Sequence, residues 1–294
     1  MPRSRISEEL PHGPLHALLA VAVLVTIYPV LWVFSIAFSG KQSLAIADLP
    51  PTPTAADRIR AVVPWPERIS ASNFTSVMTD QPFARWMVNS ALVAIFTTLL
   101  GVFLACTAAY AFSRFKFPGR RVGMMAFLVS QMFPGTLMLI PLYIIIVQLL
   151  GLGSSRIGLI IVYATTSIPF SVWMLKGYFD TIPKELEEAA VIEGASAGKI
   201  FWRIVLPLAK PAVAITALFS FMTAWNEFIL AATFMDKENM YTAPVGLRFF
   251  VGGFSQQWGY FAAGSIIVSI PVVLLFLYLQ KYLVSGLTAG GVKG

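Results

Sequence analysis

Six separate stretches of the sequence are apolar over roughly 20 residues or more, and this feature most limits how the chain can fold. They cover residues 15–38, 86–112, 122–150, 157–175, 211–234 and 261–283. A bilayer core requires about 20 mostly apolar residues per helix, because every backbone polar group must be hydrogen-bonded within the segment. The sequence therefore predicts an all-α integral membrane protein with six transmembrane helices.

The composition supports a membrane protein. Hydrophobic residues make up 57% of the chain and charged residues 12%, whereas soluble domains carry about 25% charged residues. The first stretch contains Ser35-Ile36-Ala37, small residues of the kind that a signal peptidase accepts. Its apolar part is longer than that of a signal peptide, so we favour a membrane anchor over a cleaved signal.

The Lys and Arg residues predict the orientation, because cytoplasmic loops carry an excess of them. If the N-terminus is inside, the turn 113–121 is cytoplasmic and carries four cations and no acid. Both termini are therefore predicted to be cytoplasmic, with a segment 1–14, a transmembrane domain 15–284 and a tail 285–294. Five prolines in 49–66 predict an extended external loop, since proline cannot donate a backbone hydrogen bond.

The longest predicted inner loop, about 176–210, is expected to form a helix, a bend and a second helix. Asp180-Thr181 and Pro183 resemble a helix start, and the glutamates that follow suit the first turn of a helix. Gly194 is the expected bend. The second helix, 197–205, has apolar residues at three-to-four spacing that suit the membrane surface: Ile200, Phe201, Ile204 and Val205. From the residues alone, this loop either docks a soluble partner or merely covers the bundle.

A spaced motif in this loop resembles a known family. Glu188-Ala189-Ala190 is followed after three residues by Gly194 and after nine more by Ile204-Val205-Leu206-Pro207. This pattern resembles the EAA loop of prokaryotic ABC importer permeases, although Glu193 stands where the family commonly has Asp. The resemblance extends along most of the chain to the carbohydrate-importer branch of this family, and especially to the smaller permease subunit of maltose transporters. That closer resemblance rests on the stretches 109–114, 131–134, 176–179 and 286–294.

The resemblance implies that the EAA helix seats in a cleft of a cytoplasmic ATP-hydrolysing subunit. It assigns this coupling contact to Glu188, Ala189, Ala190, Gly194, Leu206 and Pro207. A second contact falls to the tail residues Gly290, Gly291, Lys293 and Gly294, for which a frayed terminus is the alternative. The implied partners are a second homologous permease, two ATP-hydrolysing subunits, an extracytoplasmic solute-binding protein and membrane lipid, with no nucleic acid. The implied cargo is a sugar, maltose or a malto-oligosaccharide, imported across the cytoplasmic membrane of a prokaryote.

The chain lacks the sequence features of an ATPase. A phosphate loop reads G-x-x-x-x-G-K-[ST], and the nearest match, 194–200, is one residue short between its glycines and lacks the hydroxyl. ATP and Mg²⁺ are therefore expected on partner subunits, with no cofactor in this chain and no enzyme activity of its own. His12 and His16 lie four residues apart, but two ligands with no nearby cysteine do not make a metal site.

One acid, Glu227, falls inside a predicted span, and an ionisable group there is a candidate for function. Trp225, Asn226 and Glu227 could present an aromatic face and hydrogen-bonding groups to a sugar. They could equally contact a neighbouring helix or lie in the aromatic belt at the membrane surface. We therefore keep these three residues as candidates for the substrate path, with a structural role as the alternative.

Other residues in the spans predict bends and close contacts. Pro134 and Pro141 in the third span and Pro271 in the sixth each remove a helix hydrogen bond and can produce a kink. Gly101, Ala105 and Ala109 recur every four residues and suit a close helix contact, within the chain or with a second permease.

Three functions remain open from the sequence. A transport permease is the leading hypothesis. A membrane scaffold that recruits a cytoplasmic protein through the same loop without transport is the alternative. An intramembrane enzyme would need clustered catalytic groups that one glutamate does not supply.

Overall fold

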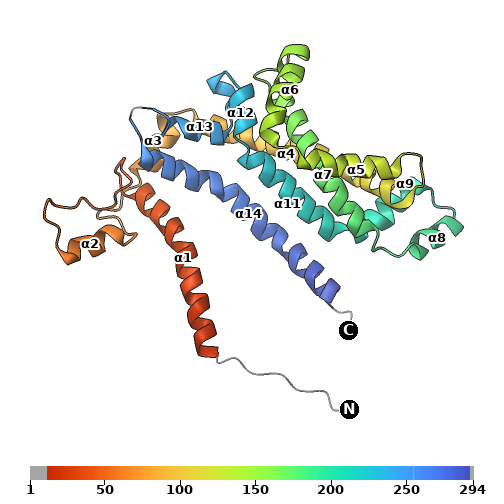
Figure 1. Ribbon diagram of the computed structural model, residues 1–294, viewed down its shortest axis with the longest axis horizontal. Coiled ribbons are helices and arrows are strands. Elements are labelled where there is room, and N and C mark those ends of the chain that lie inside the picture. Colours follow the sequence, from red (N-terminus) through yellow and green to blue (C-terminus); the bar gives the residue numbers. More distant parts are fainter. Residues whose placement is uncertain (1–11, 254, 292–294) are drawn as a thin grey trace. The chain divides into compact units, whose positions relative to one another are not determined.

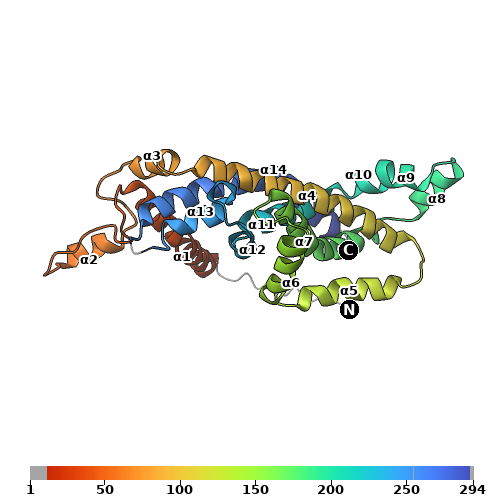
Figure 2. The same ribbon diagram turned by 90° about the horizontal axis from the view of Figure 1, so that it is seen from above.

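The computed structural model describes residues 12–253 and 255–291, and over these residues the chain is helical, with no strand among them. The chain forms two compact units, Met1–Gln81 with Leu247–Ile267, and Pro82–Gly246 with Val268–Gly294. Figure 1 labels most of the α-helices, and Figure 2 labels α10. The elements are α1 (His12–Phe38), α2 (Ala55–Val62), α3 (Ser72–Thr79), α4 (Phe83–Arg114), α5 (Arg120–Met132), η1 (Gly135–Met138), α6 (Leu139–Tyr143), η2 (Ile144–Leu149), α7 (Arg156–Phe179), α8 (Glu185–Ile192), α9 (Ala197–Ile200), η3 (Phe201–Val205), α10 (Leu206–Leu208), α11 (Lys210–Asn226), α12 (Ile229–Phe234), η4 (Glu238–Met240), α13 (Ala243–Phe249) and α14 (Trp258–Gly291).

Four helices are long and apolar enough to cross a membrane. They are Gly13–Phe38, Phe83–Arg114, Arg156–Phe179 and Trp258–Tyr282, and they match the first, second, fourth and sixth predicted spans. Two further pairs of helices meet the same test only when taken together. These are Arg120–Met132 with Gly135–Leu149, bent by 100°, and Ala197–Leu208 with Lys210–Asn226, bent by 80°. The total is six if each bent pair counts as one span.

The third predicted span, 122–150, is wrong as a single helix. Helix α5 ends at Met132. Phe133 has extended backbone, and Pro134, with ψ 125°, is also outside the helical region. Proline pushes the residue before it out of the helical region and removes a donor, so Pro134 accounts for the break. The predicted kink is present here and is sharp. By contrast, Pro271 lies inside α14 without ending the helix.

The fifth predicted span, 211–234, is also wrong as a single helix, because α11 ends at Asn226 and α12 starts at Ile229. Glu227 between them has extended backbone. Its Oε1 accepts a hydrogen bond from the Leu230 N–H at 2.8 Å, and its Oε2 accepts one from the Ala231 N–H at 3.0 Å. The carboxylate therefore caps the first turn of α12, which explains why an acid stands at the break.

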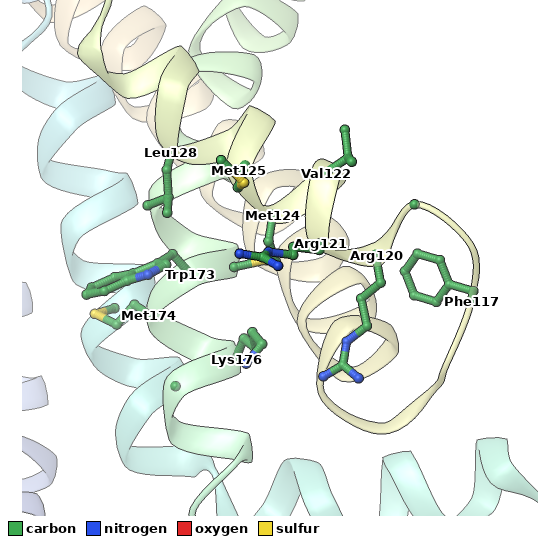
Figure 3. A pocket seen from close by; sticks show the side chains of 12 residues that line it. Phe117, Arg120, Arg121, Val122, Met124, Met125, Leu128, Trp173, Met174 and Lys176 are labelled. Atoms are coloured by element: carbon green, nitrogen blue, oxygen red, sulfur yellow. The ribbon is translucent and has the colours of Figure 1, made fainter.

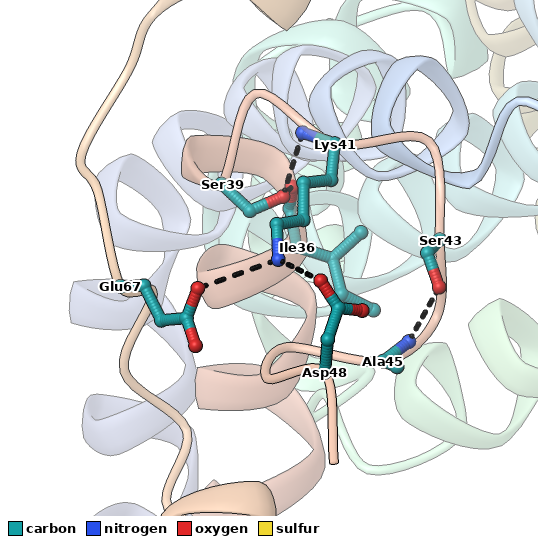
Figure 4. Close-up of polar contacts among 7 residues, drawn as sticks. All are labelled: Ile36, Ser39, Lys41, Ser43, Ala45, Asp48 and Glu67. Carbon is teal, nitrogen blue, oxygen red and sulfur yellow. Dashed lines mark hydrogen bonds and ion pairs between the residues drawn. The ribbon is translucent and has the colours of Figure 1, made fainter. Parts of the chain in front are cut away.

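The first unit holds a helix that the sequence did not predict. Residues 49–66 were expected to be extended, but Thr54 and Asp57 form a capping box that starts α2, and the five prolines lie on either side of this helix. Nearby, Lys41 Nζ contacts Asp48 Oδ2 at 2.8 Å and Glu67 Oε2 at 3.4 Å (Figure 4). One half-buried lysine thus joins the two ends of the loop that contains α2.

The core of the second unit is built where α4 packs along α7 and α11 (Figure 2). The predicted small-residue face of α4 lies in this contact, since Ala105 and Ala109 are fully buried. A Cβ atom added at Gly101 would lie 3.3 Å from Ser167 Oγ and 3.6 Å from Ser220 Oγ. The close contact predicted from these residues is therefore made within the chain.

Candidate functional site

The segment from α8 to α10 projects beyond the ends of α4 and α7 (Figures 1 and 2). We call this segment, residues 180–209, the projecting loop. Helix α8 begins at Glu185 and has three glutamates in its first turn. Their negative charge interacts favourably with the positive end of the helix dipole. The predicted start at Asp180-Thr181 is wrong, because α7 continues to Phe179 and the Asp180 N–H still bonds the Lys176 carbonyl oxygen.

The bend lies where the sequence predicted it, at Gly194. This residue has φ +82°, the left-handed conformation that glycine adopts without a Cβ clash. Its N–H donates to the Val191 carbonyl, and the Ala195 N–H donates to the Ala190 carbonyl, both at 2.9 Å. This pair of bonds is a Schellman motif, which satisfies the last carbonyls of α8. Ser196 then caps α9 by accepting from the Lys199 N–H.

A buried ion pair fastens the projecting loop to the end of α4. Arg114 Nε donates to Glu187 Oε1 at 2.5 Å, and the two side chains are 8% and 11% exposed. Tyr110 Oη donates to Glu187 Oε2 at 3.1 Å, and Arg114 Nη2 donates to the Ile182 carbonyl at 3.0 Å. A buried pair of this kind fixes geometry, because each charge needs the other.

A second contact, around Asp180, supports the same junction. Ser113 Oγ donates to Asp180 Oδ1 at 2.6 Å, and Lys176 Nζ donates to Asp180 Oδ2. Burial of the Asp180 carboxyl acts to raise its pKa, but the hydrogen bonds from Lys176 and Ser113 outweigh it and hold the pKa below its ordinary value. The Asp180 carboxylate therefore stays ionised at neutral pH and keeps its hydrogen bonds with Ser113 and Lys176.

The predicted coupling residues fall on two sides of this loop. Glu188, Ala189 and Gly194 are exposed, and so is Pro207, while Leu206 is half-buried. Ala190 is 8% exposed and lies in the core of its own chain. The apolar residues expected along the membrane surface also lie in that core: Ile200, Phe201 and Val205 are buried, and Ile204 packs against them.

Sequence reasoning missed two sets of residues. One is the exposed apolar tip, Leu186, Val191 and Ile192, which are 46%, 60% and 87% exposed; they lie beside the motif but do not belong to it. The other is the anchor made by Arg114 and Glu187. Arg114 was used to predict orientation and belongs to the resembling stretch 109–114, but neither use pairs it with Glu187. The two residues are 73 positions apart, so no local pattern reveals the pair.

Glu227 lines a cavity of about 720 Å³ formed by the bent third span, α7 and the start of α12. Its polar lining also includes Gln131, Thr165 and Thr166. Tyr163 Oη donates to Glu227 Oε2 at 2.6 Å, so three donors in all stabilise the carboxylate. A charge satisfied in this way is tolerated inside a membrane protein.

The other two candidates for the substrate path lie differently. Trp225 is 2% exposed, its Nε1 donates to the Val268 carbonyl at 3.1 Å, and its ring stacks on Phe221. Asn226 is exposed at the end of α11. The structure therefore places Glu227, but not Trp225, on the cavity wall.

A smaller hollow of about 180 Å³ shares Gln131 and Thr166 with this cavity. Ser220 lines it, and the Ser220 hydroxyl has no hydrogen-bond partner within the described part of the chain although the residue is 3% exposed. Phe170 and Phe219, with ring centroids 6.1 Å apart, form its apolar side. Hydroxyls beside aromatic rings suit a ligand that is itself both polar and apolar.

The predicted tail is partly helical. Helix α14 runs to Gly291, so Gly290 and Gly291 belong to it, whereas Lys293 and Gly294 lie outside the described residues. Within the described part of the chain, no three His, Cys, Asp or Glu residues converge in a way that could hold a metal ion.

Comparison with known proteins gives consistent matches. A family model described as "Binding-protein-dependent transport system inner membrane component" matches residues 69–288. The galactooligosaccharides transport system permease protein GanQ of Bacillus subtilis (strain 168) is 36% identical over 280 residues, covering 95% of this chain and 94% of GanQ. The maltodextrin transport system permease protein MalD of Streptococcus pneumoniae (strain ATCC BAA-255 / R6) is 36% identical over 227 residues, covering 77% and 81%.

A solved structure shares the fold. The crystal structure of a bacterial ABC transporter involved in the import of the acidic polysaccharide alginate aligns with a TM-score of 0.76 at 24% sequence identity, covering 96% of this chain and 99% of that chain. The family model covers most of this sequence, and GanQ matches it along almost its whole length. The chain therefore belongs to the family of inner membrane components of binding-protein-dependent transport systems.

Proposed function

We propose that this chain is the permease subunit of an ATP-driven importer that moves an oligosaccharide by alternating access. It works with a second homologous permease, two cytoplasmic ATP-hydrolysing subunits and an extracytoplasmic solute-binding protein. The relatives are named as permease proteins, which are transport subunits and not enzymes. ATP and Mg²⁺ then bind to the partner subunits.

The observation that carries the proposal is the projecting loop with its exposed apolar tip. Ile192 is 87% exposed and stands beside the exposed Glu188 and Ala189. A patch of apolar side chains at the end of a well-anchored element favours contact with another protein. We assign this surface as the contact with an ATP-hydrolysing subunit.

The anchor gives this contact a mechanical consequence. Because Glu187 is tied to Arg114, a displacement of α8 by its partner is passed to the end of α4 through a buried ion pair. Helix α4 in turn packs along α7 and α11, so movement of the loop reorients the helices that line the cavity around Glu227. Alternating access follows if ATP binding moves the loop.

For the cargo, we propose a malto-oligosaccharide. The support is the name of MalD, together with a cavity whose wall carries an amide, hydroxyls and one satisfied carboxylate. Such groups can exchange hydrogen bonds with sugar hydroxyls. GanQ is named for galactooligosaccharides, so a galacto-oligosaccharide is the competing cargo, and the two are separated by competition for uptake.

Replacing the apolar tip tests the coupling assignment. We expect Ile192→Glu to reduce the ATPase subunit retained with the purified permease, since it places a charge in an apolar contact. Uptake of labelled maltotriose by reconstituted vesicles should fall in parallel. The matched control is Ile69→Glu, the same change at a residue that is 68% exposed and lies between the first and second predicted spans, on the face predicted to be external.

Three outcomes would contradict parts of the proposal. Full retention of the ATPase and full uptake with Ile192→Glu would remove the coupling assignment. A wild-type complex that binds its ATPase yet takes up no oligosaccharide would favour the membrane scaffold. Uptake that galacto-oligosaccharides block and malto-oligosaccharides do not would replace the cargo but leave the coupling assignment intact.

A further inference from the structure

A cavity of about 920 Å³ lies between the start of α5 and the end of α7, outside the sites described above. Figure 3 shows Arg120 and Arg121 from the first turn of α5 and Lys176 from the last turn of α7 on its wall. The rest of the labelled wall is apolar: Phe117, Val122, Met124, Met125, Leu128, Trp173 and Met174. The cavity therefore has a basic part and an apolar part.

The basic part carries uncompensated positive charge. Among the described residues, neither Arg120 nor Arg121 has a carboxylate partner, whereas Lys176 is paired with Asp180. The connecting turn 113–121 contains no acid. The cavity thus presents two free guanidinium groups and one shared ammonium to any ligand, and it favours an anion.

The apolar part is open, although its side chains avoid water. Val122, Met125 and Trp173 are 71%, 55% and 51% exposed within this chain. In a membrane protein such side chains face lipid tails or another protein. Figure 3 shows Met125 and Leu128 further along α5 than the two arginines, so the apolar wall continues away from the basic end.

The cavity lies at the end of the second unit where the projecting loop is attached. Lys176 on its wall is hydrogen-bonded to Asp180, and Asp180 is bonded to Ser113 at the end of α4. This is the membrane face predicted to be cytoplasmic. Anionic lipids give that face of a membrane a negative surface potential.

We propose that this cavity binds an anionic phospholipid of the cytoplasmic leaflet. Its phosphate accepts hydrogen bonds from Arg120 and Arg121, and its acyl chain lies along Met125, Leu128 and Trp173. Arginine suits a phosphate because its planar group can donate two parallel hydrogen bonds. An amphipathic anion matches both parts of the cavity, whereas a neutral sugar would leave the two guanidinium groups unpaired.

The test titrates the delipidated, assembled complex with phosphatidylglycerol and counts bound lipid by native mass spectrometry. We expect one phosphatidylglycerol more for the wild type than for R120Q/R121Q. We also expect the apparent affinity of that variant to fall by about tenfold or more, given roughly 1 kcal/mol per basic residue near an anionic lipid surface. The matched control K116Q/K210Q removes the same charge at this face from two exposed lysines that do not line the cavity, and it should change the affinity less than twofold.

A second variant keeps the charge and fills the apolar part. Met125→Trp changes an exposed side chain, so the fold is preserved while the acyl chain is obstructed, and binding of phosphatidylglycerol should again weaken. Any of four results would overturn the proposal: equal weakening by both double variants, equal binding of phosphatidylcholine, displacement of the lipid by millimolar inorganic phosphate, or no bound phosphatidylglycerol because a partner subunit covers the cavity.

Discussion

Arg114 and Glu187 show how one pair of side chains decides whether the projecting loop is a rigid element. Both side chains are nearly buried, and the guanidinium also bonds the Ile182 carbonyl and the Ser113 hydroxyl. Compared with two well-packed apolar residues, the pair contributes little to the stability of the folded protein. Removal of one partner, however, leaves the other charge buried and unpaired. The energetic effect of the pair therefore appears when it is broken.

At the residue scale, we predict that Glu187→Gln loosens the projecting loop. A neutral amide cannot compensate Arg114, and breaking a buried pair costs about 3–5 kcal/mol. Hydrogen exchange of the backbone amides of α8 should accelerate, and uptake should fall by more than ATP hydrolysis. These are the changes expected when the loop still binds its partner but no longer transmits its movement.

The matched control is Glu185→Gln, because Glu185 is an exposed acid in the first turn of the same helix and forms no ion pair within the described part of the chain. It should change the protection of α8 by far less than Glu187→Gln does. Tyr110→Phe removes one hydrogen bond to Glu187 and keeps the charge pair, so its effect should lie between the two. Equal exchange rates in the Glu187→Gln and Glu185→Gln variants would contradict the anchor.

At the scale of helices, the sequence predicts those elements whose stability depends on one long apolar run. Helices α1, α4, α7 and α14 coincide with predicted spans to within a few residues at most ends. The two failures share a cause. At Pro134 and at Glu227 a single residue redirects the backbone, and hydropathy averaged over 20 residues does not respond to one residue.

The bend of the projecting loop was predictable because glycine has a specific conformational role there. Gly194 adopts φ +82°, and a Cβ added at that position would meet nothing within 4 Å. Substitution therefore costs backbone strain and no packing. For an ordinary residue the left-handed conformation costs about 1–2 kcal/mol, and asparagine adopts it more readily.

We predict a graded loss of coupling at Gly194. Gly194→Asn should be nearly neutral, Gly194→Ala should reduce uptake per ATP hydrolysed, and Gly194→Pro should abolish uptake because proline fixes φ near −65°. Uptake and ATP hydrolysis measured in the same reconstituted vesicles give this ratio.

Gly198→Ala is the control, since Gly198 lies in helix α9 with nothing within 4 Å of an added Cβ, and alanine favours a helix. Equal ratios for Gly194→Pro and Gly198→Ala would contradict the role of the bend.

For the whole molecule, the sequence gives the family and the number of apolar stretches, but not which distant residues meet. The resemblance to ABC importer permeases agrees with the family match over 69–288. The pairs Ser113 with Asp180 and Arg114 with Glu187 join segments 67 and 73 residues apart. Such pairings depend on how α4 and the projecting loop pack, which no local spacing encodes.

Orientation in the membrane is a property of the whole chain that the charge distribution predicts. Of the 21 Lys and Arg residues, most fall on the side of the projecting loop, so that loop should be cytoplasmic and residues 49–66 external. Cys106, the single cysteine, is 4% exposed. Replacing it with alanine therefore gives a background in which one introduced thiol reports its own side of the membrane.

In that background, Arg58→Cys and Lys199→Cys place the thiol at exposed positions in α2 and α9. A membrane-impermeant maleimide should label Arg58→Cys in intact spheroplasts, and Lys199→Cys only after the membrane is permeabilised. The control is a permeant maleimide, which should label both variants without permeabilisation. If the impermeant reagent labels Lys199→Cys in intact spheroplasts, the projecting loop lies outside the cytoplasm and no ATP-hydrolysing subunit could reach it. The coupling assignment and the orientation are then rejected together.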